Sequence, residues 1–195
     1  MSLALLDRAG VAALAASGPE EAMRAIAQAC FDSLGDRSAH LRPGALKEGE
    51  RQYFVSGTFF VTPDRQHHML VGSIGFPAEQ RRLMVPIDGG HPARVMATRA
   101  PLLLANTDED QGFRQYLKSS RMGSSAYAPM LFRGAFLGQL IIAAQARHTL
   151  GEGDLAALTA AAHLAAAVWM AQGGPDWLRA NANPPEAYYA AKQGL

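Results

Sequence analysis

The chain has 195 residues, of which 49% are hydrophobic and 18% are charged, values typical of a folded soluble domain. Its formal net charge of +1 provides no large field of one sign, so neither nucleic acid nor an anionic membrane is an expected partner. The single cysteine, Cys30, excludes an internal disulfide framework and a zinc site built only of cysteines.

The N-terminal segment, MSLALLDRAGVAALAAS, is the place where a targeting signal would be recognised. Asp7 and Arg8 interrupt its apolar stretch and no basic region precedes it, so it lacks the pattern of a secretion signal. No run approaches the roughly 20 consecutive apolar residues that a membrane helix needs. We therefore expect residues 1–17 to form a helical extension of a cytoplasmic protein.

A second helix and a first hairpin are predicted next. Ser17 and Glu20 have the spacing of a capping box, and apolar residues then recur at helical intervals. Residues 36–50 are polar and are expected to form a loop. The segments 53–62 and 67–76 read as strands, and the sequence PDRQ between them predicts a hairpin turn.

The centre of the chain alternates short strands with short helices. Residues 82–87 and 102–105 are predicted strands, the second without alternation and so buried on both faces. Pro92 stands where a first helical turn begins, which predicts a short helix over 93–98. A capping-box spacing and an apolar side predict another short helix over 108–117.

The C-terminal part begins with a second hairpin, formed by predicted strands 125–132 and 135–145. Residues 149–172 then repeat apolar side chains at three and four positions, which predicts a long helix with one broad apolar stripe. The tail, 173–195, is rich in Ala, Asn and Pro, and we expect it to be partly disordered or to pack on a partner.

This order of elements predicts an α+β fold. Its sheet is expected to hold about six antiparallel strands, with the N- and C-terminal helices on one face. The opposite face is left to the short helices and loops of residues 77–124, and a sheet face covered in this way is a natural place for a small-molecule pocket. The predicted boundaries are an extension over 1–17, a domain over 18–172 and a tail over 173–195.

The same elements resemble a GAF domain, the small-molecule sensor module of signalling proteins. The strand MVPI, the pair Gly89-Gly90, the helix and proline of ARVMATRAP, and the strand LLLANT match the family's central pattern. SAYAPMLFRGAFLGQLIIAAQ matches its closing hairpin, and TLGEGDLAALTAAAHLAAAV its final helix. The resemblance covers about residues 18–172, and it implies a GAF/PAS-like fold with a ligand site.

Departures from the family's branches leave the ligand and any cofactor unknown. The Asn-Lys pair of the cyclic-nucleotide-binding branch is absent from the sequence. The bilin-binding branch needs a cysteine near the pocket, whereas Cys30 is expected on a helix across the sheet. The free methionine-sulfoxide reductase branch uses several cysteines, and this chain has one. No output segment is attached, so we expect signalling through a separate effector protein or through assembly.

His91 and Arg94 flank the start of the short central helix. Free N–H groups, the helix dipole and a guanidinium there favour a carboxylate or a phosphate. The alternative is that His91 caps the turn and Arg94 is solvated. A third interpretation makes His91 an axial haem ligand.

A second group of candidate ligand contacts comes from aromatic and buried polar side chains. The residues expected to line an apolar pocket with polar tips are Tyr127, Tyr116, Phe113, Phe76 and Met84, with plain core packing as the alternative. Ser56, Thr58 and Gln139 lie on apolar strands, and they become ligand hydrogen-bond donors if they point toward the loop side. Strand parity puts Ser56 and Thr58 on one face together without showing which face it is.

The sequence therefore predicts a non-catalytic sensor that binds a small, anionic or aromatic molecule between the sheet and residues 77–124. Its signal is expected to pass through a homodimer contact of the terminal helices. The alternative is an interaction or dimerisation module whose pocket is filled by its own side chains. An enzyme is a third class, but no glycine elbow surrounds Ser124-Ser125 and no phosphate loop or dinucleotide fingerprint occurs.

Overall fold

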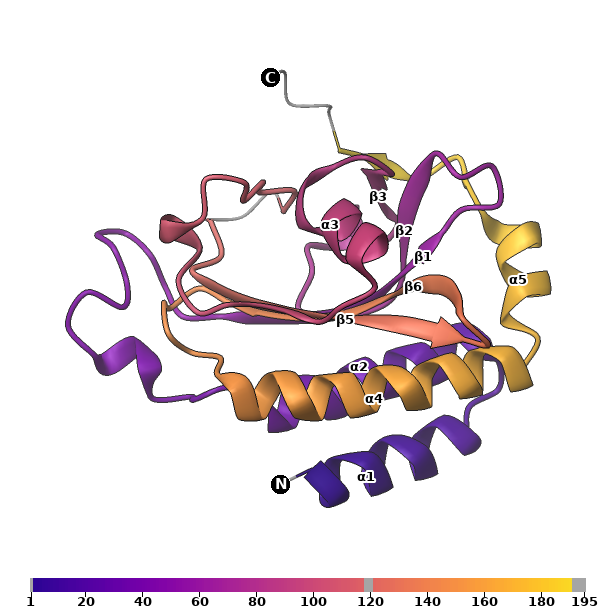
Figure 1. Ribbon diagram of the computed structural model, residues 1–195, viewed down its shortest axis with the longest axis horizontal. Helices are drawn as coiled ribbons and strands as arrows, with labels where there is room; N and C mark the ends of the chain where they lie inside the picture. Colours follow the sequence, from indigo (N-terminus) through magenta and orange to yellow (C-terminus); the bar gives the residue numbers. More distant parts are fainter. Residues whose placement is uncertain (1, 118–120, 191–195) are drawn as a thin grey trace.

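The computed structural model describes residues 2–117 and 121–190, and its sheet lies between the terminal helices on one face and a short helix with loops on the other (Figure 1). The helices are α1 (Ser2–Leu14), α2 (Pro19–Ser33), α3 (Gly90–Thr98), α4 (Glu152–Ala171) and α5 (Gly174–Asn181). The strands are β1 (Phe54–Val61), β2 (His67–Ile74), β3 (Leu83–Pro86), β4 (Leu102–Leu104), β5 (Ser124–Phe132), β6 (Ala135–Ala144) and β7 (Tyr188–Tyr189).

The sheet has the strand order β4-β5-β6-β1-β2-β3-β7. Its first six strands pair antiparallel, and both predicted hairpins, β1–β2 and β5–β6, are present. The seventh strand, β7, pairs parallel with β3 and corrects the expected strand count. The tail, 173–195, was expected to be partly disordered or to pack on a partner. Its described part instead forms α5 and β7 on the domain itself, and residues 191–195 lie outside the described residues.

Three helices form the layer below the sheet, as the sequence predicts. α2 and α4 pack directly on the strands, and α1 lies outside them, in contact with both (Figure 1). The core of this layer includes the ring of Trp169 on α4, stacked on Phe60 of β1 with centroids 3.8 Å apart. α4 is 20 residues long, with a mean hydropathy of 1.4, which matches a membrane span in length and composition. Its contacts with the sheet on one side and with α1 on the other account for that apolar character.

Above the sheet, α3 and the connections around it cover the other face (Figure 1). The predicted helix over 108–117 is wrong: only the 3₁₀ turn Thr107–Glu109 forms there. Asn106 caps that turn by accepting a hydrogen bond from the Asp108 N–H, and the Asp110 carboxylate accepts one from the Gly112 N–H. Such local side-chain bonds offer the backbone an alternative to helix, and here they prevail.

The sheet therefore separates two hydrophobic clusters. The helix side holds Phe60, Met69, Leu140 and Ile142, with the apolar faces of α1, α2 and α4. The other side holds Val55, Phe59, Leu70 and Ile141, with side chains from the covering connections. Because neighbouring strand residues alternate between the faces, β1, β2, β3, β5 and β6 contribute to both clusters.

Candidate ligand pocket

A small cavity lies on the upper face of the sheet, between the strands and residues 113–117. Its volume is about 60 Å³, room for about two water molecules. Five aromatic side chains contribute to its walls: Phe59, Phe76, Phe113, Tyr116 and Tyr127. The aliphatic part of the lining comes from Val55, Leu83, Val85, Leu117, Met122, Ile141 and Ala143. A predominantly apolar lining of this kind is typical of small-molecule sites.

Polar atoms enter this lining at a few points. Ser125 and Tyr127 lie two residues apart on β5, so both face the cavity, and the Ser125 hydroxyl has no hydrogen-bond partner among the described residues. Burial raises the pKa of Tyr127 to about 12, so the phenol stays protonated and can donate a hydrogen bond. Arg114 and Gln115 contribute from residues 109–117, which cover the cavity and are called the covering segment below.

His91, at the start of α3, connects that helix to the covering segment. Its ring is 4% exposed and lies between the rings of Tyr127 and Phe113, with centroids 6.0 and 5.7 Å away. The His91 Nε2 atom is 3.3 Å from Oδ2 of Asp110, and Arg94 approaches the same oxygen to 3.8 Å. Burial lowers the pKa of His91, and the opposing effect of Asp110 does not restore it to its ordinary value.

The double glycine before α3 allows this close packing. Gly90 has a φ of 53°, in the left-handed region that favours glycine. A Cβ atom on Gly89 would lie 2.5 Å from the hydroxyl oxygen of Tyr116, so no other residue fits there without a shift. The two glycines thus let the Tyr116 side chain approach the beginning of α3.

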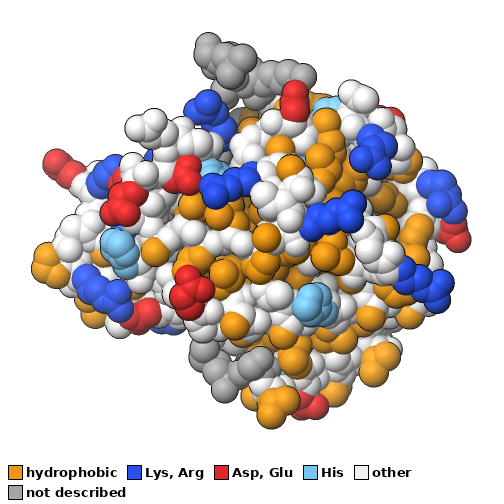
Figure 2. All heavy atoms as spheres, in the orientation of Figure 1, with side chains coloured by type: hydrophobic (Ala, Val, Ile, Leu, Met, Phe, Trp, Pro, Cys, Tyr) orange, Lys and Arg blue, Asp and Glu red, His pale blue; other side chains and the backbone are white. Residues whose placement is uncertain are grey.

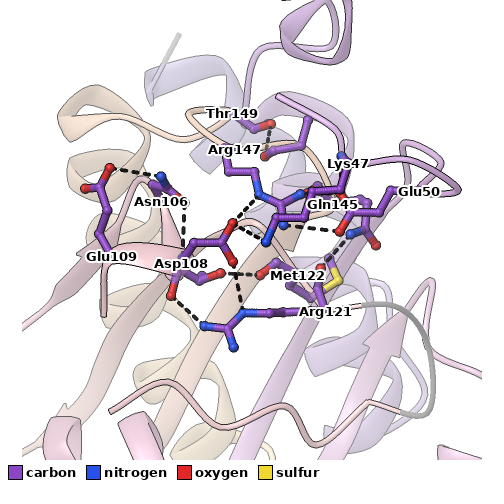
Figure 3. Close-up of polar contacts among 12 residues, drawn as sticks. Lys47, Glu50, Asn106, Asp108, Glu109, Arg121, Met122, Gln145, Arg147 and Thr149 are labelled. Carbon is purple, nitrogen blue, oxygen red and sulfur yellow. Dashed lines mark hydrogen bonds and ion pairs between the residues drawn. The ribbon is translucent and has the colours of Figure 1, made fainter. Parts of the chain in front are cut away.

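An ion-pair network centred on the buried Arg147 holds both ends of the covering segment (Figure 3). Arg147, only 3% exposed, donates from Nε to Asp108 at 3.0 Å and from Nη2 to Glu50 at 3.1 Å. Lys47 and Arg121 pair with the same Asp108 carboxylate at 2.8 and 3.3 Å. Because Asp108 precedes the covering segment and Arg121 follows it, the network fixes the points where that segment leaves and rejoins the sheet.

The carboxylates of this network remain ionised well into the acid range. The Lys47 ammonium and then the Arg147 guanidinium hold the pKa of Asp108 below its ordinary value, against the effect of burial. Burial alone would raise the pKa of Glu50, but hydrogen bonds from Arg147 and from the Lys47 backbone outweigh it and lower the pKa. Both groups therefore contribute stability above their unfolded pKa values that is lost as the pH falls.

The model of the GAF domain family matches residues 18–169 of this chain. The chain belongs to the GAF domain family. Domains of this family are typically small-molecule-binding sensors. No curated protein matches the chain closely enough to suggest a particular ligand or output.

Solved structures agree with the family on the fold. The GAF domain of an Acinetobacter phosphoenolpyruvate-protein phosphotransferase superimposes with a TM-score of 0.70 at 12% identity, over 88% of this chain and 94% of that one. The corresponding Coxiella burnetii domain gives 0.69 at 21% identity, over 89% and 96%. Free methionine-R-sulfoxide reductase from Neisseria meningitidis, solved with its substrate, gives 0.68 at 15% identity, over 88% and 89%. At these identities the likeness shows the fold alone.

Thiol chemistry does not fit this GAF domain's cavity. Cys30 lies on α2, fully buried in the helix-side cluster, so the sheet separates it from the cavity. Burial raises the pKa of its thiol to about 12, which removes the reactive thiolate. The haem interpretation of His91 gains no support, because the His91 Nε2 atom is directed at the Asp110 carboxylate, 3.3 Å away.

Several sequence-predicted site residues come together around the cavity. Four of them contribute to its walls: Tyr127, Tyr116, Phe113 and Phe76. His91 lies beside two of these rings, with its Nε2 directed at Asp110. The Arg94 side chain is 58% exposed and is not part of the lining.

Three predicted contacts lie on the wrong face of the sheet. Met84 belongs to the helix-side cluster, and Ser56 pairs with Ile142 of that same cluster. Ser56 donates to the Ile141 carbonyl and Thr58 accepts from the Gly72 N–H, so both hydroxyls are satisfied within the sheet. None of the three reaches the cavity, because strand alternation directs them toward the helices.

Other lining residues were missed at the sequence level. The cavity lining also includes Val55, Phe59 and Ile141. The sequence shows which strand residues share a face of the sheet, but not which of the two faces the helices cover. Asp110 lies within the segment predicted as a helix over 108–117. Its contact with His91, 19 positions earlier, leaves no local signal in the sequence.

Proposed function

We propose that this GAF domain is a non-catalytic sensor that binds a small molecule in the cavity between the sheet and residues 113–117. The observation that carries the proposal is the aromatic cavity itself, with two hydroxyls on its β5 wall. A flat apolar molecule fits these walls by stacking and edge contacts with the surrounding rings. The alternative is an interaction module that works without a ligand.

The surroundings favour an aromatic ligand over an anionic one. His91 and Arg94, the cationic candidates, both lie next to the Asp110 carboxylate. An anionic ligand at the start of α3 would have to displace Asp110 and its hydrogen bond from the Gly112 N–H, 2.7 Å long. An apolar ring in the cavity does not compete with Asp110 for those hydrogen-bond partners.

A ligand larger than two water molecules requires the covering segment to move outward. Residues 113–117 contain no regular helix, and His91–Asp110 joins them to α3. A ligand that binds the open arrangement better than the closed one shifts the population between them. We infer that this shift, passed through the sheet to the terminal helices, is the signal.

A cavity-filling substitution tests the ligand site. Ala143→Val places two methyl groups into the cavity, and we expect the folded protein to keep its stability but to lose ligand binding. The measurement is thermal unfolding with a panel of small aromatic compounds, after native mass spectrometry for a co-purified molecule. A ligand at 100 times its Kd should stabilise the wild type by about 2.7 kcal/mol and the variant much less.

The matched control for that experiment is Ala135→Val, the same change at an exposed position of the same strand. It should respond to ligands as the wild type does. If the wild type carries no molecule and no compound shifts its unfolding, the sensor proposal is wrong and the interaction module is favoured.

For the output we propose a homodimer through α1. Three large hydrophobic side chains lie on the same, outward-facing side of this helix. Their exposed fractions are 84% for Leu3, 64% for Val11 and 81% for Leu14. Figure 2 shows hydrophobic atoms along the lower edge of the molecule, where α1 lies in Figure 1. A second copy of this helix offers the same surface, so a two-fold contact would cover both.

Charged substitutions on α1 test this dimer. The double variant Leu3→Glu/Leu14→Glu should be monomeric in size-exclusion chromatography with light scattering at concentrations where the wild type is dimeric. Leu41→Glu is the control, because Leu41 is 74% exposed but lies outside α1, in the 3₁₀ turn Ala39–Leu41. A monomeric wild type, or a double variant that stays dimeric, would contradict the proposal.

A further inference from the structure

Besides Ser125, two buried polar side chains on the upper face of the sheet make no hydrogen bond within the described part of the chain. They are Gln139 on β6 and His68 on β2, both 0% exposed. Both amide atoms of Gln139 and both ring nitrogens of His68 are unpaired among the described residues. The Ile87 backbone lies near enough to affect the His68 pKa, but without a hydrogen bond of good geometry. Buried polar groups are nearly always paired, so this pair needs an explanation.

The sheet register places both residues on the face of the sheet that forms the base of the cavity, called the floor below. Gln139 is directly opposite Phe59 and two positions before Ile141, which both line the cavity. His68 is directly opposite Val85, another lining residue. Directly opposed residues of antiparallel strands share a face, so Gln139 and His68 point to the cavity side.

Helix α3 covers this part of the floor. At its beginning, His91 lies beside Tyr127 of β5. At its end, Arg99 donates to the Gly134 carbonyl in the β5–β6 turn, at 2.9 Å. Gln139 pairs with Pro129, between those two levels, so α3 passes over it. Gln139 therefore lies beneath α3, and His68, on the second strand from β6, lies on the same face of the sheet with its ring 6.5 Å from that of Phe136.

We propose that the ligand of this site carries a neutral polar head group that both donates and accepts hydrogen bonds. This head group binds Gln139 and His68 on the cavity face of the sheet while an aromatic ring occupies the cavity. The inference rests on the proposed sensor function and specifies the chemistry of its ligand. A carboxamide is the simplest such group, because the Gln139 amide presents the complementary donor and acceptor.

The neutral character follows from the residues that would receive the head group. Burial lowers the pKa of His68 to about 4, so its ring is neutral at pH 7 and offers one donor and one acceptor. The Gln139 amide carries no charge either. An ionised head group would lose its hydration there without gaining a counter-charge from this pair.

Three probes of similar shape test the proposal: benzamide, benzoate and toluene. On the wild type we expect benzamide to raise the Tm most, toluene less and benzoate least. Gln139→Met keeps the length of the side chain and removes both polar atoms. The unliganded variant should unfold about 2–4 °C higher than the wild type, because an unpaired buried amide is gone. Its toluene shift should be retained, and the extra shift from benzamide should disappear.

A structural role for Gln139 predicts the opposite stability change, a lower Tm in Gln139→Met. An equal benzamide shift in wild type and variant, or a benzoate shift larger than that of benzamide, overturns the proposal. A toluene shift without a benzamide advantage refutes the head-group site and leaves the sensor function standing, whereas no response to any probe counts against both. If Gln139→Met does not fold, His68→Phe gives the same comparison.

Discussion

Replacing Arg147 by methionine is expected to lower the free energy of unfolding by about 3–5 kcal/mol. The guanidinium is 3% exposed and bridges Glu50 and Asp108, whose side chains are 12% and 28% exposed. Removal of the cation leaves two partly buried carboxylates without their main counter-charge, and desolvated charges of that kind are costly. Urea denaturation at pH 7 measures the difference.

The matched control is Arg121→Met, which removes another cation from the same Asp108. Arg121 is 40% exposed and its pair with Asp108 is 3.3 Å long, so solvent screens much of the interaction. We expect a loss below about 1 kcal/mol. A loss that small for Arg147→Met would mean that the network contributes little, and the explanation of how the covering segment is held would be wrong.

Arg147→Met should also loosen the covering segment over the cavity. The Arg121 guanidinium donates to the Thr107 carbonyl at 2.7 Å, and the Thr107 hydroxyl donates to the Met122 carbonyl at 2.6 Å. These bonds lie directly beside Asp108, so they depend on the position that Arg147 gives to that residue (Figure 3). In hydrogen exchange, amides of residues 107–117 should exchange faster in Arg147→Met, while those of α4 change in proportion to global stability alone.

The strands and long helices were readable from the sequence because local patterns and tertiary packing agree there. β1, β2, β5 and β6 carry apolar runs bounded by turn residues, and α4 is a long apolar helix that packs on the sheet and on α1. The covering segment is the exception. Its capping-box spacing and apolar positions predict a helix over 108–117, yet its side chains bond to their own backbone, to His91 and to the ion-pair network instead.

The candidate site could be predicted only in part, for a related reason. The aromatic side chains of the covering segment were identified as pocket residues because a segment that packs on a sheet needs apolar contacts with it. The faces of β1 and β3 were not predicted correctly. Strand alternation places Ser56 and Thr58 on the same face, but the packing of the helices determines which face they cover. The tail likewise had no pattern that distinguishes β7, a two-residue strand, from a free end.

Gly72→Ala is expected to destabilise the domain by about 1–3 kcal/mol, although alanine fits strands no worse than glycine does. A Cβ atom on Gly72 would lie 2.5 Å from the Arg24 nitrogen and 2.6 Å from the Met23 carbonyl carbon, both backbone atoms of α2. No side-chain rotation relieves such a contact, so α2 must move away from β2. Urea denaturation midpoints, with unchanged slopes, measure the loss.

Gly10→Ala provides a control of opposite sign. Gly10 lies within α1 with no atom within 4 Å of the added methyl group, so helix propensity alone should stabilise the protein by up to about 1 kcal/mol. If Gly72→Ala also stabilises the protein, α2 does not rest on the β2 backbone as described.

The contact at Gly72 also bears on how a ligand could be sensed. The pairing of β1 with β2 shifts between Gly57 and Phe59, where two residues of β2 face one of β1, as in a β-bulge. Around that bulge, Leu70 belongs to the cavity-side cluster while Val71 belongs to the helix-side cluster. A displacement of Leu70 by a ligand would therefore reach the α2 backbone within two residues. Gly72→Ala, which separates α2 from β2, should weaken ligand-dependent changes in dimerisation more than it weakens ligand binding itself.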